Sequence, residues 1–508
     1  MGRLAERGII CASLHCSSKP KAKNLNSPAA PASVPAATPR IIPRSEHAVS
    51  RAGISPNALR VLYRLRDAGF QAFLVGGCVR DMLLGIEPKD FDVATDALPE
   101  QVKRLFRNCR LVGRRFRLAH VFFGRETIEV ATFRAASAPS QSEEPMPDAD
   151  PEDGEAPEMD EPPEAEPAEV EVSAEEDLHR VFDETGRIIR DNVYGSIGED
   201  VWRRDFTANA LYYNIADFSL WDYVGGAEDI AARTLRLIGD PETRYREDPV
   251  RMLRAARFQA KLGFGLDPAT AAPISALRDL LGGVPPARLF DETLKLFLSG
   301  HGARSLEVLK ELGLLAGLMP TVDAYLRMHP GSLVEQLLMQ GLRNTDARVI
   351  ADRPVTPTFL FALLLYGPIA KAIEAAPPAH WHELGTILDA CDRAVRESQV
   401  HIAIPRRFAL GVREMFSLQP RLEHPRWRRS LRLLEHPRFR AAFDLLLLRA
   451  EYGLASRDTA LWWTRLQEVS PEERASMADE IEGSLPRREG ARRGPRRRRR
   501  RRRPASST

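Results

Sequence analysis

The chain has 508 residues, enough for two to four globular domains. Hydrophobic residues make up 44% of it, which excludes a wholly disordered protein. No apolar run reaches the roughly 18 residues that a membrane-spanning helix needs, so we expect no transmembrane segment.

Charge is distributed unevenly although the totals nearly cancel. The chain holds 73 Lys and Arg against 70 Asp and Glu, a net charge of +3. Residues 135–179 hold 17 acidic residues and no Lys or Arg, whereas residues 487–503 hold 12 Arg and one Glu. Without these two segments the chain would carry a net charge of +9. A basic body with a very basic tail indicates a polyanionic partner, and we expect a nucleic acid.

Cysteine usage and the N-terminus indicate the compartment. The apolar stretch within residues 1–16 is short and interrupted, and no small-residue cleavage site follows it, so it is a poor secretory signal. The five cysteines follow no spacing typical of metal sites or disulfide frameworks; they are Cys11, Cys16, Cys78, Cys109 and Cys391. We therefore expect a cytoplasmic protein without a membrane partner.

The first predicted elements form a small α/β unit with a mixed sheet. Residues 1–45, rich in Ala, Pro, Ser and Lys, are expected to be disordered. Ser55 and Pro56 are typical of a helix start and Gly69 of its end. Apolar periodicity then predicts a strand at 72–75, a helix at 79–84, a strand at 91–94, a helix at 99–106 and paired strands at 120–123 and 127–133.

An acidic interruption precedes a part that is predicted to be almost entirely helical. Residues 139–177 contain eight Pro and almost no large apolar residues. Such a segment cannot bury enough surface to offset the entropy of ordering, so we expect a disordered loop insertion. Beyond Leu237, helical periodicity recurs at 249–262, 286–299, 304–315, 332–342, 357–365 and 439–451.

This organisation predicts an α+β fold, in which a small mixed-sheet head precedes an all-α neck and body. We expect disordered tails and one disordered acidic insert. The predicted units are an extension over 1–50, a head over 51–217 with the insert at 139–177, a neck over 218–300, a body over 301–480 and an Arg-rich tail over 481–508.

Asp90 and Asp92 are the first candidates for chemistry. Alternate residues of a strand face the same side, so both carboxylates would project together while Phe91 points into the core. Adjacent carboxylates favour a cation between them, and hard oxygen ligands suit Mg²⁺. Such ions would activate a hydroxyl and stabilise a departing pyrophosphate. The alternative is a solvated strand end, which is the commoner meaning of Asp-x-Asp.

Two neighbouring features strengthen the hypothesis. Gly76 and Gly77 separate a strand from a helix, a turn that exposes backbone N–H groups to a phosphate, and Arg80 would clamp that phosphate. The alternative is a structural turn with an Arg80–Asp81 ion pair. Glu129 stands between β-branched residues on a predicted strand, where an acid breaks the apolar pattern. Its alternative is an ordinary outward-facing position.

At this point the pattern resembles the nucleotidyltransferase family of bacterial poly(A) polymerases and tRNA CCA-adding enzymes. Residues 74–81 (LVGGCVRD) with 89–93 (KDFDV) resemble its first motif, and 202–211 (WRRDFTANAL) its second. Residues 222–226 (DYVGG) resemble its third motif and 244–258 (RYREDPVRMLRAARF) its nucleotide-selecting helix. Four motifs in this order are highly specific.

The later motifs add candidate residues. If Asp205 starts a helix, Asn209 lies on the same face one turn later, and Arg204 beside them would bind the triphosphate. Asp248, Arg251 and Arg254 would form a row of one acceptor and two donors.

The resemblance implies that this row reads the edge of a base without a template, with Asp248 on adenine; a salt-bridged helix face is the alternative. The resemblance also supports a catalytic role for Asp205, but the spacing does not rank it against Glu129 as the third acid after Asp90 and Asp92.

The implied activity is transfer of AMP from ATP to an RNA 3′-hydroxyl, with release of pyrophosphate and promotion of RNA turnover. Residues 111–121 and 433–444 resemble the poly(A) polymerase branch, and the Arg tail suits sequence-independent phosphate contacts. Expected ligands are Mg²⁺, ATP and the 3′ ends of mRNA, small RNA and decay intermediates. The resemblance adds RNA-decay machinery and an RNA chaperone as partners.

Three rival functions remain. A tRNA CCA-adding enzyme is the nearest, and it would be discriminated by CTP with a tRNA lacking its end. A silent RNA-binding protein would lack the metal site, which the Asp90/Asp92 pair argues against. A metal-dependent phosphohydrolase is not supported by any His-Asp cluster in the sequence.

Overall fold

The computed structural model describes residues 38–113, 117–135, 181–182, 188–190, 194–425, 431–474 and 476–477. Its sheet has eight strands in the order β1-β10-β9-β2-β3-β6-β5-β4, and only β3 and β6 are parallel neighbours. In chain order these strands are β1 (Arg40–Ile42), β2 (Ala72–Val75), β3 (Asp92–Thr95), β4 (Cys109–Val112), β5 (Leu118–Phe123), β6 (Glu126–Thr132), β9 (Leu211–Asn214) and β10 (Leu220–Asp222). Two small pairs lie outside it: antiparallel β7 (Val181–Phe182) and β8 (Ile188–Arg190), and parallel β11 (Thr234–Leu235) and β12 (Gly265–Leu266).

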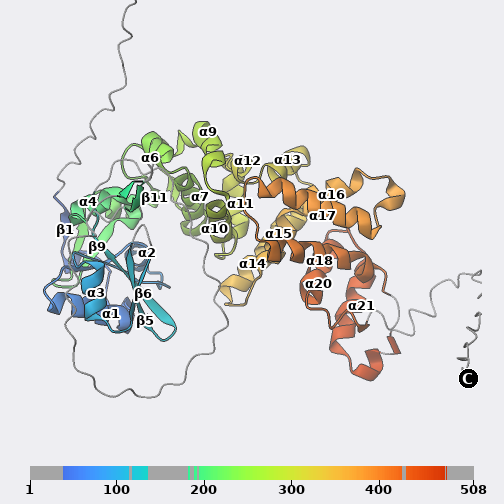
Figure 1. The fold of residues 1–508 in the computed structure, drawn as a ribbon, viewed down its shortest axis with the longest axis horizontal. Coiled ribbons are helices and arrows are strands. Elements are labelled where there is room, and N and C mark those ends of the chain that lie inside the picture. Colours follow the sequence, from blue (N-terminus) through green and yellow to red (C-terminus); the bar gives the residue numbers. More distant parts are fainter. Residues whose placement is uncertain are drawn as a thin grey trace, which may run out of the picture. The chain divides into compact units, whose positions relative to one another are not determined.

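The two faces of the sheet bury different cores. Helices α1 (Pro56–Asp67), α2 (Gly77–Leu83) and α3 (Pro99–Leu105) contribute to the core that contains Leu74 and Val93 (Figure 1). The opposite face carries Phe73 and Ala94 and packs against Val201 of α4 (Ile197–Arg203). Strand alternation produces this division, because neighbouring residues of a strand face opposite sides.

Local sequence chemistry sets the helix ends as predicted. Ser55 Oγ accepts a hydrogen bond from the backbone N–H of Ala58 at 3.0 Å, and Pro56 is the first residue of α1. Gly69 has a φ of 88°, which glycine adopts without steric cost. The predicted helix start and stop are therefore confirmed.

Most of the remaining helices contribute to one large core that runs from Phe206 to Leu448, and a second core joins Leu418 and Leu422 to Trp463. The helices up to Met328 are α5 (Gly226–Ala231), α6 (Pro241–Glu247), α7 (Val250–Leu262), α8 (Pro268–Ala271), α9 (Ile274–Leu277), α10 (Pro286–Phe297), α11 (Gly302–Glu311), α12 (Leu315–Leu318) and α13 (Pro320–Met328). Those that follow are α14 (Leu333–Ile350), α15 (Pro357–Leu364), α16 (Tyr366–Glu374), α17 (Leu384–Gln399), α18 (Arg406–Glu423), α20 (Phe439–Glu451) and α21 (Arg457–Glu468).

Among the described residues, no single helix is both long and apolar enough to cross a membrane. Helices α15 and α16 reach that length and apolarity only together, and a bend of 49° separates them.

The α+β class is confirmed, with two differences in detail. Disorder over residues 1–45 is wrong for the end of that range, because β1 pairs with β10 and a 3-10 turn follows at Arg44–Glu46. The sheet therefore extends past the head predicted at 51–217 on both sides. The remainder of the predicted disordered segments, residues 1–37, 139–177 and 481–508, lies outside the described residues.

The third motif forms a structural support beneath a turn of the second. Asp222 at the end of β10 accepts hydrogen bonds from the backbone N–H groups of Val224, Gly226 and Ala227 at 3.1, 2.9 and 2.9 Å. Gly226 then packs so closely that a Cβ there would lie 2.3 Å from the carbonyl oxygen of Thr207. Thr207 begins the 3-10 turn η3 (Thr207–Asn209), so glycine at 226 lets α5 support that turn.

We expect Gly226→Ala to lower the free energy of unfolding by about 2 kcal/mol or more, because the added methyl group meets backbone that cannot yield. Thermal or urea unfolding measures this loss. Gly282→Ala is the matched control, since a Cβ at Gly282 would meet no atom within 4 Å. Equal stability of the two variants would contradict the prediction.

Candidate active site

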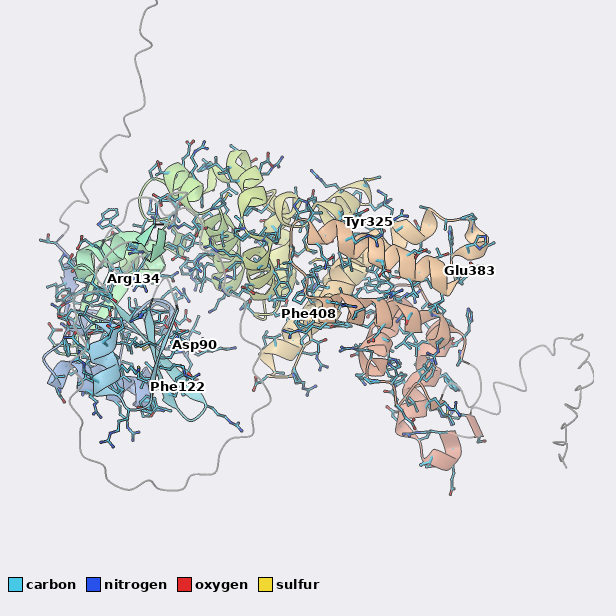
Figure 2. The ribbon with its side chains drawn as sticks, viewed as in Figure 1. Asp90, Phe122, Arg134, Tyr325, Glu383 and Phe408 are labelled. Carbon is cyan, nitrogen blue, oxygen red and sulfur yellow. The ribbon has the colours of Figure 1, made fainter. Side chains whose placement is uncertain are left out.

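Asp90 and Asp92 lie where β3 begins. Asp90 precedes the strand, Asp92 is its first residue, and both are exposed. Phe91 between them is buried in the core beneath α1, α2 and α3. The two carboxylates therefore project to the opposite side, as alternation along a strand requires. Figure 2 shows Asp90 in the strand-bearing part of the chain.

Glu129 is the neighbour of Asp92 across the parallel pair. The register of β3 and β6 aligns Asp92 with Glu129. Aligned residues of adjacent strands face the same side of a sheet, so these two carboxylates and that of Asp90 gather at one end of one face. On the other side, His120 Nε2 lies 3.6 Å from Glu129 Oε1 across the β5–β6 pair.

This crowding makes Asp92 a weaker acid. Asp92 stays accessible along one edge, but burial of its carboxylate raises its pKa to about 6, helped by the charges of Glu129 and Asp90 and opposed by Arg204. A group whose ionised form is disfavoured in this way would be stabilised by a nearby cation.

Gly76 lies next to both Asp92 and Arg204. Its φ of 83° favours glycine, and a Cβ at this position would lie 3.5 Å from Asp92 Oδ2 and 3.9 Å from Arg204 Nη1. Gly77 follows as the first residue of α2, where a Cβ would lie 3.4 Å from Arg80 Nη2. The predicted glycine turn thus separates the acidic cluster from Arg204.

Arg204 is oriented by a tyrosine and an aspartate that the sequence analysis missed. Its Nε donates to Tyr212 Oη at 2.8 Å and its Nη2 to Asp200 Oδ2 at 3.1 Å. Tyr212 Oη donates to the same carboxylate oxygen at 2.7 Å. The four-residue spacing of Asp200 and Arg204 could have predicted this pair. Tyr212 gave no such signal, because it comes from β9 and reaches the pair only in the folded chain.

Arg80 lies in the interior. Its side chain is 2% exposed, with Nε and Nη2 donating to Asp81 Oδ1 at 2.9 and 2.6 Å and Nη1 donating to Asn209 Oδ1. This is the Arg80–Asp81 ion pair that the sequence analysis gave as the alternative to a phosphate clamp, and Asn209 adds a further hydrogen bond to it. Arg80 could contact a phosphate only if these bonds broke. In this structure its side chain therefore forms the ion pair and does not form the expected phosphate clamp.

Asp205 is also held in a buried ion pair. Arg254 Nε and Nη2 donate to Asp205 Oδ2 at 2.8 and 2.6 Å, while Phe206 N and Asn209 Nδ2 donate to Oδ1 at 2.8 and 3.3 Å. Burial would raise the pKa of Asp205, but Arg254 and these hydrogen bonds outweigh it and hold the pKa below its usual value.

Asp205 does not start a helix, which was the condition for placing Asn209 on its face. Helix α4 ends at Arg203, and Asp205 lies between α4 and the 3-10 turn η3. The turn nevertheless brings Asn209 to Asp205, so the expected proximity of the two side chains arises from a different local structure.

The predicted nucleotide-selecting helix is two helices. Asp248 and Pro249 separate α6 from α7, so Asp248 does not share a continuous helical face with Arg251 and Arg254. The sequence held the signal for this break, because the residue before a proline disfavours helical backbone.

Each member of the predicted row has its own fixed partner. Arg288 Nη2, from α10, donates to Asp248 Oδ2 at 2.8 Å. Arg251 Nη1 donates to the carbonyl oxygen of Arg244 at 2.8 Å and to Glu247 Oε2 at 3.1 Å. Arg254 instead binds Asp205, so the three side chains are held by three different sets of partners. Arg288 was missed because nothing local to it indicates that α10 packs beside Asp248.

The donor set fits Mg²⁺ in an open site. Across the part of the chain that the structure describes, no group of three His, Cys, Asp or Glu forms a ready-made metal cage. Mg²⁺ commonly takes one or two carboxylates and completes its shell with water and substrate phosphate. Asp90 and Asp92, beside Glu129, supply oxygen donors with excess negative charge at a solvent-accessible edge.

Comparisons with known proteins identify the family. The model "Poly A polymerase head domain" matches residues 72–236, "Probable RNA and SrmB- binding site of polymerase A" matches 263–326, and "Polymerase A arginine-rich C-terminus" matches 380–504. Poly(A) polymerase I of Salmonella typhi is 44% identical over 460 residues, which cover 89% of this chain and 91% of that protein. Poly(A) polymerase I of Escherichia coli is 45% identical over 456 residues, 88% and 90% of the two chains. The chain belongs to the bacterial poly(A) polymerase family.

Other similarities are more distant. The CCA-adding enzyme of Bacillus velezensis is 34% identical over 268 residues, 53% of this chain and 56% of that enzyme. A solved "tRNA-processing enzyme (apo form I)" shares the fold at a TM-score of 0.52 and 21% identity, over 85% of this chain and 98% of that one. The poly(A) polymerase resemblance seen in the motifs is thus confirmed over nearly the whole chain, and the chain is a nucleotidyltransferase.

We expect Asp205→Ala to lower the free energy of unfolding by about 3 kcal/mol at pH 7, because it leaves a largely buried Arg254 without its carboxylate. The pKa of Asp205 is depressed in the folded state, so its contribution is complete above the unfolded pKa and is lost as pH falls through the folded value. The stability gap from wild type should therefore shrink as pH drops below about 4. Urea unfolding at several pH values tests this, and a gap independent of pH would contradict it.

Proposed function

We propose that this chain transfers AMP from ATP to the 3′-hydroxyl of RNA without a template. The observation that carries the proposal is the in-register placement of Asp92 and Glu129 beside Asp90, Gly76 and Arg204. It occurs in a chain 44–45% identical to named poly(A) polymerases. The 3′ oxygen bonds to the α-phosphorus, the bond to the bridging oxygen of pyrophosphate breaks, and the hydroxyl proton passes to solvent.

Asp90 and Asp92 would hold Mg²⁺, which when bound lowers the pKa of a hydroxyl and neutralises charge on the phosphates. Glu129 is the better third acid, because it faces the same edge while Asp205 is taken up by Arg254. Positioning and charge stabilisation supply most of the rate in such transfers.

The triphosphate would lie over the glycine turn. Gly76 and Gly77 leave room for it, and Arg204 would donate to it from a position fixed by Tyr212. Arg80 and Asn209 would act indirectly, by holding the segment around Asp205 in place.

Adenine would be read by Asp248, which precedes α7, and by Arg251 of α7, with Arg254 fixing the position of that helix. Adenine offers one donor and one acceptor on its pairing edge, which a carboxylate and a guanidinium complement. The bonds from Arg288 to Asp248 and from Arg251 to Glu247 restrict both groups to one position, so that selection would need no template.

The finer biology rests on the family resemblance. We propose a cytoplasmic enzyme that acts on the 3′ ends of mRNA, small RNA and decay intermediates, in contact with RNA-decay machinery and an RNA chaperone. Incubation with Mg²⁺, a generic RNA and each nucleotide separately tests the core activity. Extension with ATP alone supports it, and extension only with CTP on a tRNA lacking its end would refute it.

Replacing Asp90 or Asp92 by Ala should reduce AMP incorporation by about a thousand-fold or more, because charge stabilisation at the reacting phosphate is lost. Both positions are exposed, so thermal unfolding should change little. Asp67→Ala, at an exposed aspartate paired with Arg66, is the matched control and should retain full activity. Full activity of Asp92→Ala would remove the site assignment.

Glu129→Gln and Asp205→Asn should separate the two candidate acids. Glu129 is half-exposed, so we expect a large fall in kcat with little change in stability. Asp205→Asn weakens a buried ion pair, so stability should fall as well. Steady-state kinetics and unfolding on both variants test this; normal kcat in Glu129→Gln would exclude Glu129.

A further inference from the structure

One aromatic ring lies within contact of three arginines near the candidate active site. Phe258 of α7 is 8% exposed. The guanidinium carbons of Arg80, Arg254 and Arg257 lie 5.5, 5.8 and 4.6 Å from the centre of its ring. All three distances fall within the range of cation–π attraction.

Two of these arginines connect α7 to other elements. Arg254 joins α7 to Asp205, just before the turn η3. Arg257 Nε lies 3.6 Å from Glu292 Oε2, which joins α7 to α10.

The third arginine completes the arrangement from the sheet side. Arg80 joins α2 to Asn209 on the same turn η3. Phe258 is therefore surrounded by the groups that hold α2, η3, α7 and α10 together.

The ring is itself fixed in orientation. Phe206 packs edge-to-face against Phe258, with ring centres 5.6 Å apart. The backbone N–H of Phe206 donates to Asp205 Oδ1, so the ring is supported by the segment that carries the carboxylate of the Arg254 ion pair. Three positive groups this close would repel one another in a poorly solvated region, and the face of the ring offsets part of that repulsion.

The proposed site has a metal-binding part and a base-reading part, and the contacts around Phe258 join the elements that carry them. Asp90 and Asp92 lie where β3 begins. Asp248 lies just before α7, and Arg251 lies in its first turn. The position of α7 against η3 therefore sets where a base lies relative to the reacting phosphate. We propose that Phe258 is a positioning residue for nucleotide selection, which acts by holding the arginine cluster that fixes α7; this rests on the proposed function.

A ring that served only as core packing would affect stability and leave selection unchanged. Phe290 of α10 provides the comparison, because it is 9% exposed and stacks on Phe361 with ring centres 5.8 Å apart. It belongs to the helical core and has no part in the arginine cluster described above.

The experiment compares Phe258→Leu, Phe258→Tyr and Phe290→Leu with wild type. For each, kcat and KM are measured with ATP and with CTP on the same RNA, alongside the melting temperature. Phe258→Leu should lower the ATP-over-CTP ratio of kcat/KM by about ten- to a hundred-fold, since a small misplacement of the base costs that much. Phe258→Tyr, which keeps the ring, should stay near wild type, and Phe290→Leu should lose melting temperature but keep the ratio.

An unchanged ratio in Phe258→Leu, or an equal loss in Phe290→Leu, would overturn the inference. If Phe258→Leu does not fold, Phe258→Met, whose unbranched side chain adapts better to an irregular gap, is judged by the same two outcomes. Wild-type protein that incorporates no AMP at all would refute the proposed function, and the inference with it, whereas AMP incorporation with unaltered selection refutes the inference alone.

Discussion

Three carboxylates lie close together where β3 begins, and the repulsion between their charges is the constraint on which the rest of the site depends. Parallel pairing with β6 forces Asp92 and Glu129 onto one face, next to Asp90. Partial burial, and then repulsion from Glu129 and Asp90, raise the pKa of Asp92. Gly76 keeps the adjoining space free, and Arg204 supplies positive charge from across that space. A site built this way is complementary to a cation and a polyphosphate together.

Different partners divide the arginines of this region into two groups with different tasks. Arg204 borders the space above Gly76, and its partners fix its direction. Arg80 and Arg254 are committed to Asp81, Asn209 and Asp205. Removing one partner of a buried ion pair leaves an uncompensated charge, so loss of any of these partners should be costly to the fold. Motif membership alone did not distinguish the two groups.

The differences between prediction and structure have separate physical causes. Asp205 satisfies the motif but its carboxylate faces Arg254, a residue far along the chain whose approach depends on the packing of α7. Asp248 was placed on a continuous helix although Pro249 contained the local signal for a break. Strand β1 was missed because three residues carry too little periodicity, and its pairing with β10 comes from the opposite end of the strand-bearing segment.

Local causes are enough to predict the Ser55-Pro56 start of α1, the glycine turn after β2, and the alternation that exposes Asp90 and Asp92 around a buried Phe91. These depend on capping, on backbone freedom and on strand geometry, which act within a few residues. Long-range packing, by contrast, sets which carboxylate lies beside Asp92 and which arginines form ion pairs with Asp81 and Asp205. Strand register and helix packing set those distances, and both depend on residues that are remote in the sequence.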